Sequence, residues 1–131
     1  MRVVFDTNIF ISAFVFPGTQ AESAIIRILE DKDVLLLSKP IIDEVLTVMS
    51  SKFSRDREAI SRVAVYLSEL GQNIDTKKKV SILKDEPDNR ILECAISGKA
   101  DAVVTGDKQM LSLIEYQGIK IITLKQYLQM M

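Results

Sequence analysis

Short, mostly apolar runs recur along the chain and alternate with segments of helical periodicity. Runs of four or five residues occupy positions 2–5, 34–37, 102–105 and 119–123. Apolar side chains at successive positions bury both faces of a strand, which is typical of a parallel sheet covered by helices on both sides. We therefore predict an α/β fold, a three-layer α/β/α sandwich around a central, mostly parallel sheet of four to five strands.

The segments between these runs carry helix signals. Thr19, with Glu22 three residues later, is typical of a capping box, and Gly71 is suited to end a helix. With no linker, repeat or low-complexity segment, the 131 residues predict a single domain spanning 1–131. The expected helices begin at Thr19 and Pro40 and cover 55–70 and about 87–97, and a short strand is expected near Ile74.

Two residue counts exclude whole classes of catalytic site. The chain contains no histidine and one cysteine, Cys94. Without imidazole, no Ser-His-Asp or Cys-His nucleophile, no paired-histidine nuclease and no histidine-bound zinc site can form. A single cysteine excludes an internal disulfide. Any enzyme of this composition must rely on carboxylates, hydroxyls, lysine or a hard cation.

Charge is unevenly distributed, although the net charge is −1. Residues 50–84 hold eight basic and four acidic residues, and the remainder holds nine basic and fourteen acidic. The basic segment has two interpretations, a rim that contacts nucleic-acid phosphates or a solvated helix face. No apolar run approaches the roughly 18 residues of a membrane helix, so we expect a cytoplasmic protein with no membrane association.

Three acidic residues are expected at one edge of the predicted sheet. Asp6 follows the first strand, Asp107 comes two residues after the end of the fourth, and Glu44 lies one turn into the helix after the second. In open parallel sheets, ligands bind beyond the carboxyl ends of the strands. The order of the elements therefore brings these carboxylates together where a ligand is expected.

Helix periodicity adds a fourth acid. Asp88 falls in line with the apolar stripe of its helix, where a lone carboxylate should not lie. Glu93 falls about 140° away at 100° per residue, which predicts that it faces solvent. The four acids also have ordinary explanations as helix caps, surface charges or partners of a helix dipole, with Asp85 as a further cap. Their joint placement at one edge favours a site.

A cluster of carboxylates restricts the chemistry. Two of them about 4 Å apart repel by on the order of 4 kcal/mol at an effective dielectric of 20. A bridging cation relieves the repulsion, and oxygen-only ligands suit Mg²⁺ or Mn²⁺. Such ions polarise phosphoryl oxygens and activate water without histidine. The sequence thus predicts a hydrolase acting on a phosphate ester.

The same residues lie in motifs of a known family. They are VVFDTN at 3–8, DE at 43–44, DEPDN at 85–89, ECA at 93–95 and ADAVVTGDK at 100–108. Over nearly its whole length the chain resembles the PIN-domain ribonucleases, specifically the short stand-alone form found as toxins of VapBC-type toxin–antitoxin systems.

The resemblance implies an endoribonuclease that depends on Mg²⁺ or Mn²⁺. It also implies an RNA substrate, a co-encoded antitoxin that covers the site, and a homodimer. Implied catalytic metal ligands are Asp6, Glu44, Asp88 and Asp107, with Thr105 as a hydroxyl near the metal, Asn8 as a hydrogen-bonding group and Asp85 as an outer acid. The residues expected to hold RNA phosphates are Lys52, Arg55, Arg57 and Arg62.

Four other functions remain open from sequence. An RNA-processing nuclease without a toxin role would carry the same residues. A haloacid-dehalogenase-type phosphatase would use Asp6 as nucleophile, but it requires an Asp where Asn8 stands. A receiver domain requires an acidic pair after the first strand, where Asp6 is single. A non-catalytic module could keep the fold and bind RNA or a partner.

Overall fold

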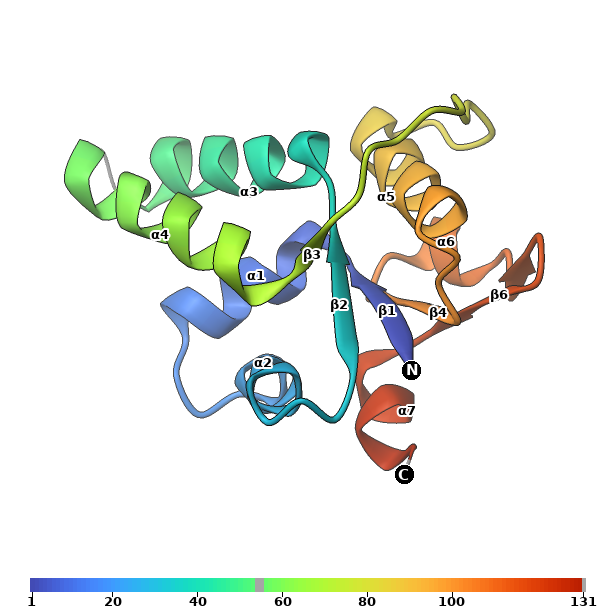
Figure 1. Cartoon of the computed structure of the whole chain (residues 1–131), viewed down its shortest axis with the longest axis horizontal. Helices are drawn as coiled ribbons and strands as arrows, with labels where there is room; N and C mark the ends of the chain where they lie inside the picture. Colours follow the sequence, from blue (N-terminus) through green and yellow to red (C-terminus); the bar gives the residue numbers. More distant parts are fainter. Residues whose placement is uncertain (54–55, 131) are drawn as a thin grey trace.

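The computed structural model describes residues 1–53 and 56–130, which form an α/β/α sandwich (Figure 1). The strands are β1 (Arg2–Phe5), β2 (Val34–Leu37), β3 (Gln72–Asn73), β4 (Ala102–Val104), β5 (Glu115–Tyr116) and β6 (Ile119–Ile122). The helices are α1 (Thr7–Val15), α2 (Gln20–Leu29), α3 (Lys39–Lys52), α4 (Arg57–Leu70), α5 (Glu86–Ser97), α6 (Lys108–Leu111) and α7 (Leu124–Gln129).

The described strands form one sheet in the order β3-β2-β1-β4-β6-β5. All neighbours pair in parallel except β5 and β6. Helix α5 packs against β1, β2 and β4 on one face, and α1 and α2 lie on the other side of the sheet (Figure 1). Helices α3 and α4 pack together as a hairpin that projects from the body. The predicted fold class is confirmed.

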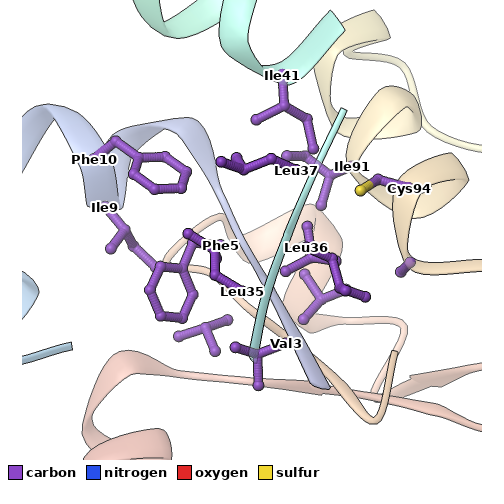
Figure 2. Packing of buried hydrophobic residues seen from close by; sticks show 14 of the residues in the cluster. Val3, Phe5, Ile9, Phe10, Leu35, Leu36, Leu37, Ile41, Ile91 and Cys94 are labelled. Carbon is purple, nitrogen blue, oxygen red and sulfur yellow. The ribbon is translucent and has the colours of Figure 1, made fainter. Parts of the chain in front are cut away.

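The core lies on both faces of β1 and β2, as their continuous apolar runs predict (Figure 2). Phe5 and Phe10 are fully buried with ring centroids 5.9 Å apart, and Tyr127 meets the ring of Phe5 edge-on at 5.5 Å. This aromatic contact ties α7 to the strand whose end carries Asp6. Burial therefore fixes the backbone from which the first acid of the predicted site extends.

A buried carboxylate links several segments at the start of β2. Asp33, just before β2, accepts hydrogen bonds from the Tyr127 hydroxyl at 2.7 Å and from the Arg27 guanidinium at 3.0 Å. Burial opposes its charge, but these bonds and one from the Met1 amino group hold the pKa of Asp33 below its usual value. This acid is fully partnered and has a structural role.

Two local predictions differ from the structure. The capping box at Thr19 does not form, because the Thr19 hydroxyl donates to the Phe16 carbonyl and Glu22 accepts from the Gly18 amide. The sheet gains the two-residue strand β5, which is too short to give an apolar pattern. It pairs with β6 through a turn in which Gln117 and Gly118 have positive φ, so the sheet exceeds the expected four to five strands.

Among the described helices, none alone is long and apolar enough to cross a membrane. Helices α1 and α2 pass that test only as a pair, and they are bent by 100° at the break between them.

Gly71 ends α4 for a reason that the sequence pattern does not reveal. Its φ of −119° is open to any residue, so no left-handed cap requires glycine here. A Cβ at this position would lie 2.8 Å from the Leu37 side chain and 3.0 Å from the Leu35 carbonyl oxygen. Glycine therefore allows the end of α4 to approach β2.

We predict that Gly71→Ala lowers the free energy of unfolding by about 1–3 kcal/mol, because the added methyl forces β2 and α4 apart. Urea unfolding followed by circular dichroism measures the change. Gly106→Ala is the matched control, since a Cβ there meets nothing within 4 Å. Equal stability of the two variants would contradict the proposed close approach.

Candidate metal centre

Four carboxylates come from three segments that meet at one edge of the sheet. Asp6 directly follows β1 and caps α1, and Asp107 follows β4 and caps α6. The Asp6 amide donates to the Val104 carbonyl at 2.9 Å, which ties the two strand ends together. Asp85 is the cap residue of α5, and Asp88 lies in its first turn. All four acids therefore lie at helix starts, Asp6 and Asp107 directly after strands and Asp85 and Asp88 after the connection 74–85.

Three of these acids lie close enough to share one cation. One carboxylate oxygen from each of Asp85, Asp88 and Asp107 lies within 4.8 Å of the other two. Asp88 is buried, and its Oδ2 has no hydrogen-bond partner among the described residues. A buried oxygen left unpaired in this way is rare unless it serves a ligand.

The acids perturb one another strongly. Burial, followed by the charges of Asp107, Asp6 and Asp85, raises the pKa of Asp88 from 3.8 to about 7. Burial also raises the pKa of Asp6, and the charge of Asp107 adds to that shift. Without a cation, Asp88 therefore stays partly protonated in the folded protein up to about neutral pH.

Thr105 links two of the acids. Its hydroxyl donates to Oδ2 of Asp6 at 2.7 Å, and its oxygen accepts from the Asp107 amide at 3.0 Å. The side chain is fully buried and lies at the end of β4, where the two interactions fix its rotamer. Thr105 thus orients the Asp6 carboxylate and the start of α6 together.

The other sequence-predicted residues lie around this cluster in different ways. The Asn8 amide donates to Oδ1 of Asp6 at 3.4 Å, but its exposed side chain makes no hydrogen bond within the described residues. Glu44 is half-buried on α3, the helix that packs against α5. The interactions that join the four aspartates do not include Glu44 in the described part of the chain.

The predicted solvent position of Glu93 is wrong. Its side chain is buried, pairs with the Arg90 guanidinium at 2.8 Å and accepts from the Val80 amide at 2.8 Å. A helical wheel cannot foresee this contact, because residues 74–85 fold back over the polar side of α5. That connection covers the face that the wheel assigns to water.

Asn89 completes this contact and was not predicted as a functional residue. Its side chain accepts from the Leu83 amide at 3.0 Å and donates to the Leu83 carbonyl at 2.9 Å. This two-bond clamp, with Glu93 and Arg90, holds the segment that ends at Asp85. Its adjacency to Asp88 in the DEPDN motif was the only available signal.

The predicted basic residues that the structure describes lie on α3 and α4. Lys52, Arg57 and Arg62 are exposed, and Arg55 lies outside the described residues. Lys52 ends α3 and Arg57 begins α4, at the tip of the hairpin, whereas α5 and α6 lie on the opposite side of Figure 1. Their predicted contact with RNA remains a prediction.

The donor set fits a hard divalent cation. All clustered groups are carboxylates, with no sulfur or imidazole nearby, which favours Mg²⁺ or Mn²⁺ over zinc or copper. A cation would neutralise the repulsion that raises the pKa of Asp88 and would give its unpaired oxygen a partner.

Comparison with known proteins decides the family. A family model described as PIN domain matches residues 2–109. The chain belongs to the PIN-domain family. PIN domains are nucleases, so a hydrolase fits both this family and the carboxylate cluster. A curated relative, the uncharacterized protein MJ1680 of Methanocaldococcus jannaschii, is 30% identical over 117 residues, which cover 86% of this chain and 75% of the relative.

Two solved structures share the PIN fold over almost their whole length. VapBC2 from Rickettsia felis, bound to a DNA fragment from its promoter, matches with a TM-score of 0.68 and 16% identity. It covers 94% of this chain and 98% of its own. VapBC-1 from nontypeable Haemophilus influenzae matches with a TM-score of 0.67 and 15% identity over 95% of this chain and 99% of its own.

We predict that Asp88→Asn stabilises the metal-free protein at pH 8 by at least about 1 kcal/mol, since it removes a repelled charge. The pKa of Asp88 is raised above the unfolded value, so the folded state binds the extra proton between about pH 4 and 7. Wild-type stability therefore falls as pH rises through this window, and the advantage of the variant shrinks at pH 5.

Urea unfolding in EDTA at both pH values measures this difference. Asp75→Asn is the matched control, because Asp75 is exposed and makes no interaction with the cluster. A variant that is less stable than wild type at pH 8 would show that the carboxylates do not repel.

Proposed function

We propose that this protein is a divalent-metal-dependent endoribonuclease and the toxin component of a toxin–antitoxin pair. The observation that carries the proposal is the trio of Asp85, Asp88 and Asp107, with the unpaired buried oxygen of Asp88, where the start of α5 meets the segment after β4 in a PIN domain. The similarity in fold to two VapBC proteins supports the toxin assignment.

In this proposal the aspartates hold Mg²⁺ or Mn²⁺, and Glu44 on α3 completes the acidic set. When bound, the cation would supply a polarised phosphoryl oxygen and an activated water. The chain itself orients Asp6 through Thr105 and fixes Asp85 through the clamp on Leu83. The raised pKa of Asp88 provides a group that can release a proton near neutral pH when the cation binds.

We predict that Mn²⁺-dependent cleavage of a mixed-sequence single-stranded RNA is lost in EDTA and in Asp6→Asn. Glu44→Gln is expected to lose cleavage too, and Thr105→Val to retain it at about 10- to 100-fold lower rate, because Asp6 loses its orienting hydroxyl. Denaturing gels of end-labelled RNA measure the rates.

Asp75→Asn, purified in parallel, controls for contaminating nuclease. Cleavage that survives in Asp6→Asn would contradict the proposed centre. No cleavage in any sample would leave the non-catalytic module, and Mn²⁺ titration of wild type against Asp88→Asn would then test the metal site alone.

We propose that Lys52, Arg55, Arg57 and Arg62 hold RNA phosphates. We predict that Lys52→Glu with Arg57→Glu raises the Michaelis constant several-fold at low salt, with an unchanged maximal rate, because phosphate contacts are lost. Steady-state cleavage at two salt concentrations measures this effect. The control is Lys120→Glu, an exposed lysine on β6. An unchanged Michaelis constant at low salt would show that Lys52 and Arg57 do not contact the RNA.

We propose that an antitoxin segment with apolar side chains occupies a groove between α1, α2 and α4. The groove has a volume of about 570 Å³ and contains Phe14, Ile26, Leu29 and Tyr66. Leu29 and Ile26 are 56% and 43% exposed, which is unusual for neighbouring large apolar residues on a monomer. The VapBC neighbours in fold make an antitoxin the occupant that we infer.

We predict that Leu29→Asp abolishes co-purification with a co-expressed antitoxin without unfolding the protein, because the side chain is already exposed. Affinity capture of the tagged protein measures the complex. Ile114→Asp is the control, since Ile114 is 75% exposed and lies outside the groove. Retained binding in Leu29→Asp would show that the antitoxin does not occupy the groove.

We also propose that the protein is a homodimer and is located in the cytoplasm. Light scattering measures the molar mass in solution and tests the dimer.

A further inference from the structure

A second hollow adjoins the metal centre and has no role in the proposal above. It has a volume of about 540 Å³, within the roughly 300–1,000 Å³ range of small-ligand sites. We call it the lateral pocket and define it by the six lining residues that the argument uses. They are Asn8, Phe16, Thr105, Gly106, Thr123 and Lys125.

The lateral pocket shares a wall with the acidic cluster. Thr105 lines the pocket, and its hydroxyl binds Asp6 of the cluster at 2.7 Å. The chain continues through Gly106, also in the wall, to Asp107. A polymer lying across the cluster would therefore place a unit next to its reacting bond in this pocket.

Gly106 keeps the lateral pocket open. A Cβ at this residue would meet nothing within 4 Å, and its φ lies outside the left-handed region that favours glycine. Neither packing nor backbone conformation therefore requires glycine here. The missing side chain leaves space in the pocket wall beside Asp107.

The groups around the pocket match the parts of a nucleotide. The ring of Phe16 meets that of Phe53 edge-to-face at 6.4 Å, and Phe16 is still 52% exposed, which leaves aromatic surface on which a base can stack. The Asn8 side chain makes no hydrogen bond within the described residues, and Thr123 uses its oxygen as an acceptor but retains its proton to donate. The exposed Lys125 supplies a positive charge for a phosphate.

We infer that the lateral pocket binds the RNA nucleotide next to the cleaved bond and selects its base. The inference rests on the proposed ribonuclease function and deepens it. Apolar side chains line much of both this pocket and the groove between α1, α2 and α4, but only the lateral pocket shares Thr105 with the acidic cluster. The lateral pocket, which touches the acidic cluster, combines an aromatic ring for stacking, amide and hydroxyl groups for hydrogen bonds, and a lysine.

The first experiment measures binding without catalysis. Metal-free protein in EDTA is titrated with each of the four nucleoside 5′-monophosphates, and backbone amide NMR shifts are followed. We expect shifts at Gly106, Thr123 and Lys125, with one base bound more tightly than the others. Gly106→Val should weaken this binding by about tenfold or more, because it adds three carbons to a residue that lines the pocket.

Lys125→Gln should weaken nucleotide binding as well, and Lys120→Gln, another exposed lysine outside the pocket, should not. Thermal unfolding of each variant confirms that Gly106→Val is folded. No shifts at the pocket up to millimolar nucleotide, or equal affinity in Gly106→Val, would overturn the inference.

The second experiment measures selection during cleavage. RNA oligonucleotides that vary in one base on either side of the cleaved bond are compared in wild type and Gly106→Val. We expect a preference in wild type that Gly106→Val loses. If both proteins cleave the oligonucleotides with the same base preference, the inference about the lateral pocket is wrong, but the proposed ribonuclease function is supported. If neither protein cleaves RNA but nucleotides bind the lateral pocket, the proposed ribonuclease function is contradicted and the nucleotide-binding site is supported.

Discussion

Parallel pairing of β1 with β4 is the constraint on which the site depends. The pairing aligns Phe5 with Val104, so both strands end at the same level. The next residues of β1 and β4 are Asp6 and Thr105, and their side chains meet in a buried hydrogen bond of 2.7 Å. A shift in this register would separate Asp6 from Asp107, and the carboxylate cluster would not form. The buried faces of both strands keep the register, since a slip of one residue exchanges the two faces.

Helix α5 adds the remaining clustered acids at an electrostatic cost. Asp88 is buried among three like charges, and the first turn of α5 offers only partial compensation through its backbone dipole. The fold sustains this arrangement because Glu93, Arg90 and Asn89 secure the preceding segment against α5. Stability elsewhere thus maintains a cluster of carboxylates that repel one another.

The acids are also ordinary helix caps, and the two roles are compatible. The Asp107 carboxylate accepts from the Gln109 and Met110 amides through Oδ1, and it also interacts with the Asp88 carboxyl group. Asp6 divides its oxygens between the Asn8 amide and the Thr105 hydroxyl. Capping therefore fixes each carboxylate at the edge of the sheet. A carboxylate in this geometry can cap a helix and bind a metal ion, so the two interpretations do not exclude each other.

Much of this architecture could be predicted from local pattern. The apolar runs determined which segments are strands, and the positions of Asp6, Asp88 and Asp107 relative to strands and helices predicted their convergence. Strand ends and helix faces follow from periods of two and 3.6 residues, which depend only on neighbours in sequence. Asp85, expected as an outer acid, lies in the trio with Asp88 and Asp107, since it caps the helix whose first turn carries Asp88.

Contacts between distant segments could not be predicted in this way. The burial of Glu93 depends on residues 74–85 folding over α5, and the role of Gly71 depends on its approach to β2. The lateral pocket joins the end of α1 to the start of α7, more than 100 residues apart. The sequence by itself determined the longer strands and helices, the fold class and the acidic character of the candidate site. Only the tertiary structure decided which faces are covered and which hollows remain, because packing between remote elements leaves no local periodicity.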